Sequence, residues 1–213
     1  HNPTGVVVPD EELKKICEWC DKNGVRLISD EIYHGLTYTG RCETVLKFTD
    51  NAIIINSLSK YFSMTGWRIG WMILPTQLIS AAEKLAQNLY ISAPTPNQIA
   101  SVKAFDCSHE LDQHVERYKE NRQVLLSGLP TEFLGSAAPC DGAFYIYADI
   151  SALSDDSIAF SKELLDRTGV ATTPGVDFDP INGHRFLRLS FAGSTATMHE
   201  AVKRINVFVK TYN

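Results

Sequence analysis

The chain has 213 residues, of which 44% are hydrophobic and 21% charged, enough for one large domain or two small ones with a hydrophobic core. Its formal net charge of -5 argues against nucleic acid or an anionic membrane surface as the main partner, because both select for basic patches. The net charge does not exclude an anionic small molecule, because a few focused positive groups can bind one inside an acidic protein. No apolar run approaches the roughly 20 residues that span a bilayer.

Predicted helices and strands alternate in the first part of the chain. Residues 9–22 form an amphipathic helix with a proline near its start and Gly24 just past its end. Two continuous apolar runs, 25–28 and 52–55, predict strands covered on both faces, and residues 69–74 predict a third. This alternation indicates an α/β fold with a mostly parallel sheet covered by helices.

The middle of the chain is predicted to be helical. Helices are expected at residues 77–90, 97–105 and 109–126. One face of the first is predicted to carry five apolar residues: Leu78, Ala81, Ala82, Leu85 and Leu89. The third helix is long and charged enough to bridge two domains.

Strands and helices mix from Gly128 onward. Four elements are predicted there: strands at 142–149 and 185–191, and helices at 157–167 and 197–212. Such a mixture over about 85 residues indicates a small α+β domain. We therefore predict that residues 1–127 are part of a large domain with its bridging helix and that residues 128–213 are a small C-terminal domain.

The five cysteines are scattered and odd in number, which indicates reduced thiols and a cytoplasmic protein. Cys17 and Cys20 have the spacing of a metal or redox motif, but they fall with Leu13 and Ile16 on one helical stripe, so we predict that they pack in the core. No second pair or nearby histidine completes a zinc set, and no metal site is expected. The first residues lack an initiator methionine and a signal pattern, and we expect the chain to be part of a longer protein.

Polar side chains follow two of the predicted strands, in Asp30-Glu31-Ile32-Tyr33 and Ser57-Leu58-Ser59-Lys60. Ligands of open α/β sheets bind beyond the carboxyl ends of the strands. A lysine there can be partly desolvated, which favours the neutral amine needed for an imine. Two serine hydroxyls and Arg68 make a suitable phosphate clamp. Taken alone, Lys60 would be interpreted as a solvated loop lysine.

Five motifs in order resemble the class I and II aminotransferases, which are fold type I enzymes that depend on pyridoxal 5′-phosphate. They are Asn-Pro-Thr-Gly at 2–5, Asp-Glu-Ile-Tyr at 30–33, Ser-Leu-Ser-Lys at 57–60, Gly-Trp-Arg at 66–68 and Phe-Leu-Arg-Leu-Ser-Phe-Ala at 186–192. The resemblance covers essentially the whole chain. One such motif is a weak signal, whereas five in order are highly specific.

The resemblance implies that Lys60 holds pyridoxal 5′-phosphate as a Schiff base. The other cofactor contacts that it implies are Asn2 and Tyr33 at the phenolic oxygen, Asp30 at the pyridine nitrogen, and Ser57, Ser59 and Arg68 at the phosphate. Arg188 is implied to bind the α-carboxylate of the substrate.

For two of these assignments, a nearby residue with the same charge could take the same role. Side chains alternate at a strand end, so only one of Asp30 and Glu31 is expected to face the cofactor, and a helix cap is the other interpretation of Asp30. Arg188 and Arg185 lie on opposite faces of one predicted strand. The alternative for Arg188 is a buried salt bridge to an acidic residue such as Asp149.

Two further segments are weaker candidates. Tyr145 lies in a segment close to the substrate in the family, but we interpret it as a half-buried strand aromatic. Pro174-Gly175 resembles a loop that closes over the family's site, although Pro-Gly is also a general turn signal.

The predicted function is amino-group transfer between an L-amino acid and a 2-oxo acid, with Lys60 as base and then acid. One alternative is another reaction on the same scaffold, such as a carbon-sulfur β-lyase. The other is a regulatory module that binds the cofactor without turnover. The resemblance also implies a homodimer in the complete protein.

Overall fold

The computed structural model describes residues 1–212, which divide into two compact units. The N-terminal unit is Val8–Gln113, and the C-terminal unit combines His1–Val7 with the chain from His114 onward. The first seven residues belong with the C-terminal unit because they pack on it closely: Gly142 N donates a hydrogen bond to Gly5 O at 2.8 Å, and a side chain at Gly5 would overlap the Gly142 carbonyl. The predicted domain division at residue 127 remains a prediction for the complete protein.

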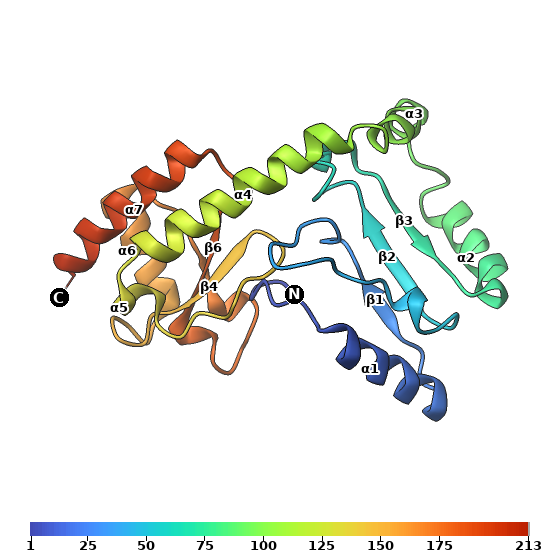
Figure 1. Ribbon diagram of the computed structural model, residues 1–213, viewed down its shortest axis with the longest axis horizontal. Helices are drawn as coiled ribbons and strands as arrows, with labels where there is room; N and C mark the ends of the chain where they lie inside the picture. The colour runs from blue at the N-terminus through green and yellow to red at the C-terminus, as the bar shows by residue number, and fades with distance from the viewer. Residues whose placement is uncertain (213) are drawn as a thin grey trace. The chain divides into compact units, whose positions relative to one another are not determined.

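The N-terminal unit contains a three-stranded sheet and three complete helices (Figure 1). Its elements are α1 (Asp10–Asn23), β1 (Ile28–Asp30), β2 (Ile53–Ser57), β3 (Gly70–Ile73), α2 (Thr76–Leu89) and α3 (Thr95–Ala104), with 3-10 turns η1 (Val45–Lys47) and η2 (Thr65–Trp67). The helix α4 (Ser108–Gly128) begins here and continues into the C-terminal unit.

The first helix, α1, ends as its sequence predicts. Gly24 adopts the left-handed conformation, with φ 64°, and closes the helix by donating to Asp21 O. Cys17 and Cys20 are buried, and Cys17 packs in a core cluster with Val45 and Ile54. The prediction that these two cysteines serve packing is confirmed.

The sheet has the order β1-β2-β3, with β1 and β2 parallel and β2 and β3 antiparallel. The three described strands are therefore a mixed set, and a mostly parallel sheet stays a prediction for the complete protein. The predicted start of β1 at residue 25 is wrong, because Val25 N donates to Cys20 O at the end of α1 and cannot join the sheet. The ladder begins two residues later, where Ile53 N donates to Leu27 O at 2.9 Å.

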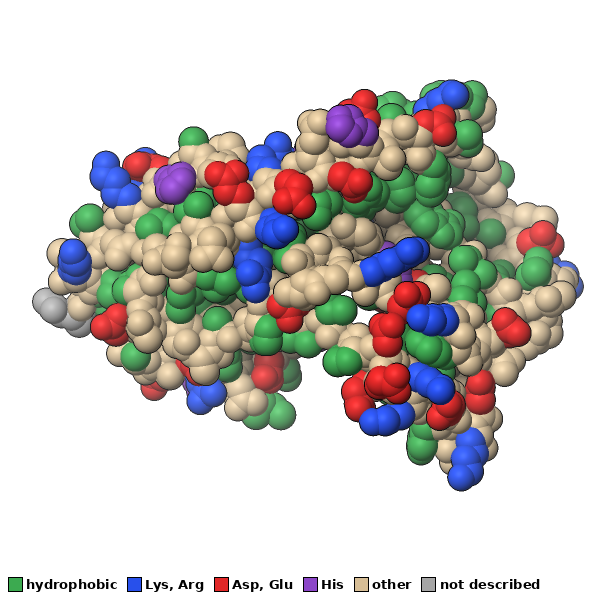
Figure 2. All heavy atoms as spheres, viewed as in Figure 1, with side chains coloured by type: hydrophobic (Ala, Val, Ile, Leu, Met, Phe, Trp, Pro, Cys, Tyr) green, Lys and Arg blue, Asp and Glu red, His purple; other side chains and the backbone are tan. Residues whose placement is uncertain are grey.

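The expectation that the strands are covered on both faces is wrong for this structure. Ile28 is 62% exposed and Met72 46% exposed, and hydrophobic side chains reach the surface of the unit (Figure 2). The apolar face predicted for α2 is likewise exposed in this structure, where Leu85 and Leu89 are 62% and 76% exposed. No element of the described N-terminal unit covers these side chains.

The C-terminal unit is a small α+β layer (Figure 1). Its elements after α4 are α5 (Thr131–Leu134), β4 (Tyr145–Asp149), α6 (Ser157–Thr168), β5 (Thr173–Pro174), β6 (Phe186–Ser190) and α7 (Thr195–Lys210), with 3-10 turns η3 (Gly175–Asp177) and η4 (Gly183–Arg185). The sheet has the order β4-β6-β5 with both pairs antiparallel.

The helices α6 and α7 begin at side-chain caps and pack against each other. Asp156 accepts from Ile158 N and Ala159 N at the start of α6, and Ser194 accepts from Thr197 N at the start of α7. Phe160 on α6 meets Phe208 on α7 edge to face, with ring centroids 5.5 Å apart. Within residues 1–212, no helix is long and apolar enough to cross a membrane.

Candidate functional site

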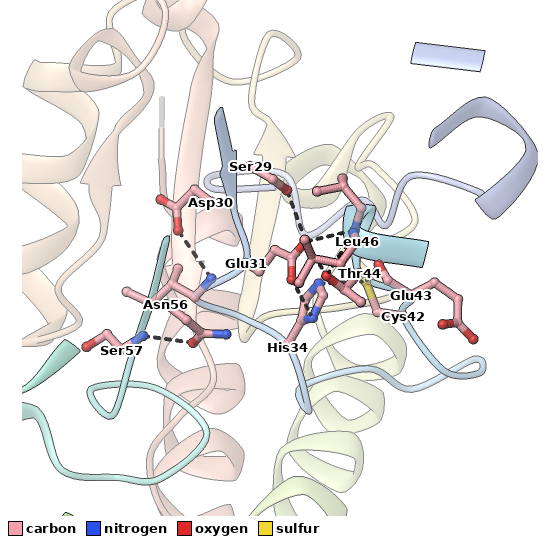
Figure 3. A network of polar contacts seen from close by, with 12 residues as sticks. Ser29, Asp30, Glu31, His34, Cys42, Glu43, Thr44, Leu46, Asn56 and Ser57 are labelled. Atoms are coloured by element: carbon pink, nitrogen blue, oxygen red, sulfur yellow. Dashed lines mark hydrogen bonds and ion pairs between the residues drawn. The ribbon is translucent and has the colours of Figure 1, made fainter. Parts of the chain in front are cut away.

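The polar clusters predicted at two strand ends lie at one edge of the sheet. Asp30, the last residue of β1, is in register with Ile55 of β2, and β2 ends two residues later at Ser57. The strands are parallel, so both clusters lie beyond neighbouring carboxyl ends (Figure 3). This part of the predicted site is therefore brought together within the N-terminal unit.

Asp30 and Glu31 point to different sides and have different surroundings (Figure 3). Glu31 is 6% exposed, and its Oε1 accepts from Thr44 Oγ1 and Val45 N, both at 3.0 Å. Its Oε2 lies 3.4 Å from Nδ1 of His34. Both carboxylate oxygens of Glu31 are thus occupied by contacts with residues of the loop from residue 31 to residue 45.

Asp30, by contrast, is exposed and accepts a single hydrogen bond, from Ile32 N at 3.2 Å. Residues 32–35 form a turn and no helix begins there, so the helix-cap interpretation of Asp30 is wrong. Among the residues described, Asp30 is the carboxylate at this strand end with oxygens available to a ligand.

The segment from Ser57 to Lys60 is a tight polar turn. Ser59 N donates to Ser57 Oγ at 3.0 Å, and the two serine hydroxyl oxygens are 2.9 Å apart. Thr65 Oγ1 donates to Ser59 O at 2.6 Å, which fastens the turn to η2. The hydroxyls of Ser57 and Ser59 therefore lie side by side, and Ser57 Oγ also donates to Ile69 O at 3.0 Å.

Lys60 and Tyr33 come together from the two strand ends. The Lys60 Nζ lies 5.7 Å from the centroid of the Tyr33 ring, within range of a cation–π contact. Both residues are half-buried. The Lys60 side chain thus lies against the Tyr33 ring rather than projecting into solvent.

Arg68 follows η2 in an unusual backbone conformation. Its φ is 53°, in the left-handed region that non-glycine residues seldom adopt. Its side chain is exposed and donates to Thr65 O at 2.9 Å. Such conformations cost about 1–3 kcal/mol and persist mostly at functional sites.

Tyr61, the residue that follows Lys60, was not among the residues predicted from the sequence. It is anchored through its hydroxyl group. Its hydroxyl donates to Asp112 Oδ1 at 2.6 Å, and burial followed by this hydrogen bond raises the pKa of Tyr61 to about 12. Its ring leaves no room for a side chain at Gly35, where a Cβ would lie 2.6 Å from Cδ2.

Asn2 and Arg188 meet within the C-terminal unit. Arg188 donates from one terminal nitrogen to Asn2 Oδ1 at 2.8 Å and from the other to Thr173 Oγ1 at 3.3 Å. Its Nε is buried and has no hydrogen-bond partner among residues 1–212. No carboxylate in the described chain pairs with this half-buried cation, which leaves it with neutral partners.

Asp149 pairs with Arg185 instead, its Oδ2 lying 3.4 Å from a terminal nitrogen of that arginine. Burial works to raise the pKa of Asp149, but hydrogen bonds from Ser151 and the Arg185 cation outweigh it and lower the pKa below its ordinary value. The alternative that Arg188 forms a salt bridge with Asp149 is therefore wrong.

The site residues predicted from the sequence thus form two sets. Six lie in the N-terminal unit, namely Asp30, Tyr33, Ser57, Ser59, Lys60 and Arg68. Asn2 and Arg188 lie in the C-terminal unit and contact each other.

The chain matches a family model and curated proteins over nearly all of its residues. The family model described as "Aminotransferase class I and II" matches residues 1–205. The chain is 49% identical to valine–pyruvate aminotransferase of Mycobacterium tuberculosis, over 96% of this chain and 54% of that protein. It is 37% identical to (5-formylfuran-3-yl)methyl phosphate transaminase of Methanocaldococcus jannaschii, over 98% of this chain and 55% of that protein.

Solved structures show the same fold. A crystal structure of an aminotransferase from Mycobacterium tuberculosis superposes with a TM-score of 0.94 at 47% identity, covering 99% of this chain and 55% of that one. Aspartate aminotransferase of Thermotoga maritima gives a TM-score of 0.87 at 31% identity, covering 99% and 54%. The chain spans about half the length of the curated relatives it matches. It belongs to the class I and II aminotransferases.

Proposed function

We propose that the complete protein transfers an amino group between an L-amino acid and a 2-oxo acid with pyridoxal 5′-phosphate as cofactor. One observation carries the proposal: the strand ends of β1 and β2 present a hydroxyl pair, a lysine against Tyr33 and an available carboxylate at one edge of the sheet. The names of the relatives agree with it, since they are aminotransferases.

The residues present fit this cofactor. Ser57 and Ser59 hold adjacent hydroxyls, and the exposed Arg68 guanidinium adds a positive charge, as a phosphate requires. Asp30 retains acceptor capacity for a protonated ring nitrogen, whereas Glu31 is fully engaged. When bound, the cofactor supplies an electron sink for the substrate's α-carbon.

The roles of the chain's own residues follow from their chemistry. Lys60 is proposed to hold the cofactor covalently and, once displaced by the substrate amine, to move a proton at the substrate's α-carbon. Asn2 and Tyr33 are proposed to hydrogen-bond the phenolic oxygen of the cofactor ring. Arg188, a cation with only neutral partners, is proposed to bind the α-carboxylate.

A donor and acceptor screen on the complete protein tests the reaction class. Valine and pyruvate are the first pair to try, because the relative at 49% identity carries their names. We expect exchange of the amino group with ping-pong kinetics and a change in cofactor absorbance on adding either substrate alone. Release of pyruvate and ammonia from cystathionine without an oxo acid would favour the lyase, and binding without turnover would favour the regulatory module.

Replacing Asp30 by Asn should preserve the fold and slow proton transfer at the α-carbon. An amide cannot stabilise a protonated ring nitrogen as a carboxylate does, and a charge partner of this kind is worth about 1–3 pKa units. The single-turnover rate should therefore fall by about 10- to 1,000-fold. A rate equal to wild type would exclude Asp30 from the ring nitrogen.

Glu31→Gln is the matched control for this substitution. The buried carboxylate accepts from Thr44 and Val45, so its loss should lower the free energy of unfolding by about 1–3 kcal/mol. The thermal midpoint of Glu31→Gln should fall, while that of Asp30→Asn should stay near wild type. Comparing unfolding and single-turnover rates for the two variants separates the structural carboxylate from the functional one.

Two further properties are part of the proposal. We propose a homodimer and a cytoplasmic location for the complete protein, in line with its family and with five free cysteines. Sedimentation of the complete protein tests the first, and fractionation of cells that express it tests the second.

A further inference from the structure

Two short turns of the N-terminal unit carry the lysine and the tyrosine that meet at the candidate site. In the first turn Leu36 N donates to Tyr33 O at 3.0 Å, and in the second Ser63 N donates to Lys60 O at 3.0 Å. The Lys60 Nζ lies 5.7 Å from the centroid of the Tyr33 ring. The position of the lysine amine therefore depends on how these two turns are held against each other.

Tyr61, in the second turn, contacts the first turn through its ring. A Cβ added at Gly35 would lie 2.6 Å from Cδ2 and 2.8 Å from Cγ of Tyr61, so the ring lies directly against the backbone of this glycine. Gly35 has a φ of 88°, in a region that residues with a side chain seldom adopt. The close approach of the two turns thus depends on the absence of a side chain at residue 35.

The hydroxyl of Tyr61 is held by a third element of the same unit. It donates to Asp112 Oδ1 of α4 at 2.6 Å, and a hydrogen bond to a charged acceptor is stronger than one between neutral groups. Because the pKa of Tyr61 is raised to about 12, the hydroxyl remains a donor at neutral and mildly alkaline pH. Phe62, the other central residue of the Lys60 turn, packs with its ring centroid 4.9 Å from that of Phe105. Both central residues of this turn are therefore anchored by their side chains.

We propose that Tyr61 is a positioning residue, which holds the Lys60 amine at the place where it bonds to the cofactor. This inference rests on the proposed function, in which Lys60 carries pyridoxal 5′-phosphate. In that bonding step the neutral Lys60 nitrogen forms a double bond to the aldehyde carbon of the cofactor, and the aldehyde oxygen leaves as water with both hydrogens of the amine. The amine has to be held close to that carbon, since a misplacement of about 1 Å can cost about 100-fold.

Binding of two forms of the cofactor to the complete protein, from which its own cofactor has been removed, tests this role without turnover. Pyridoxal 5′-phosphate bonds to Lys60, whereas pyridoxamine 5′-phosphate has the same ring and phosphate but an amine in place of the aldehyde, and cannot. Tyr61→Phe should weaken binding of the pyridoxal form about tenfold and leave the dissociation constant of the pyridoxamine form within about twofold of wild type. Quenching of the protein's fluorescence measures both constants, and visible absorbance measures the bonded fraction.

The acceptor of the hydroxyl supplies a second variant and its rescue. Asp112 is exposed, so Asp112→Ala should fold and should reproduce the effect of Tyr61→Phe, with no further loss when the two substitutions are combined. Asp112→Asn retains an oxygen that can accept and should restore most of the binding of the pyridoxal form. Asp166→Ala is the matched control, because it removes an exposed helical carboxylate that accepts from Lys162 at the same distance of 2.6 Å. It should change neither dissociation constant.

A purely structural role for Tyr61 would give a different pattern. Equal weakening of both cofactor forms in Tyr61→Phe would show a general loss of folding rather than a displaced amine, and would overturn the inference. Unchanged binding of the pyridoxal form, or additive losses in the variant that combines Tyr61→Phe with Asp112→Ala, would overturn it as well.

Lys60→Ala in the same titration separates failure of this inference from failure of the proposed function. If Lys60→Ala binds the pyridoxal form as tightly as wild type does, the proposed role of Lys60 is wrong, and the positioning role of Tyr61 falls with it. If Lys60→Ala weakens binding of the pyridoxal form and Tyr61→Phe does not, only the positioning role is wrong.

Discussion

Replacing Lys60 by Ala should abolish turnover and remove the visible absorbance of the covalently held cofactor. Lys60 follows the carboxyl end of β2 and faces Tyr33, and the proposal assigns it both the covalent bond and the proton transfer. The loss of a general acid–base alone is typically 10²- to 10⁴-fold, so we expect a decrease on the order of 10⁴-fold or more. Stopped-flow absorbance and steady-state rates of the complete protein measure both effects.

Borohydride reduction followed by mass spectrometry gives the direct control for Lys60. The cofactor's mass should appear on the peptide that contains Ser57 to Lys60 and on no other lysine peptide. Lys103 is a suitable comparison, because it is an exposed helical lysine paired with Asp106. Lys103→Ala should change neither the absorbance nor the rate. Reduced cofactor attached to another lysine would disprove the assignment.

Replacing Arg188 by Lys should weaken binding of the amino acid far more than it changes the rate of the bound complex. A single ammonium cannot reproduce two parallel hydrogen bonds to a carboxylate, and it would also lose the hydrogen bond to Asn2 or that to Thr173. Breaking one partner of a buried charged pair costs about 2–5 kcal/mol. The dissociation constant should therefore rise by roughly 30- to 5,000-fold.

Arg185→Lys is the matched control for Arg188→Lys. Arg185 ends η4, three residues before Arg188 of β6, but its side chain is 45% exposed and pairs with Asp149. Its replacement should cost some stability and leave substrate affinity near wild type. Equal effects of the two substitutions on affinity would show that the assignment of strand faces is wrong.

The order of elements and the positions of the motifs were predictable from the sequence. The helical stripe of α1 placed Cys17 and Cys20 in the core, and both are buried. The predicted strand put Arg188 and Arg185 on opposite faces, and their partners differ in the structure, although Arg185 ends η4 and lies just before β6. These predictions succeed because they depend on neighbours within a few positions, where helical and strand periods dictate which side chains share a face.

Contacts between distant positions were decided only by the tertiary structure. Whether Asp30 or Glu31 remains available depends on Thr44 and Val45, 13 and 14 residues after Glu31, which occupy the oxygens of Glu31. The start of β1 depends on Val25 N being taken by the end of α1.

Arg188 also has some features that the sequence predicted and others that only the tertiary structure decided. Periodicity alone determined which face of its strand Arg188 occupies, and the motif determined its proposed role. Its actual partners are Asn2, far back in the chain, and the rings of Tyr145 and Phe178. No periodic signal links positions so far apart, because their proximity results from the pairing of β4 and β5 with β6 and from the tight packing of glycines around η3. The residue types were therefore set by the sequence, whereas the contacts that surround Arg188 were decided by the fold.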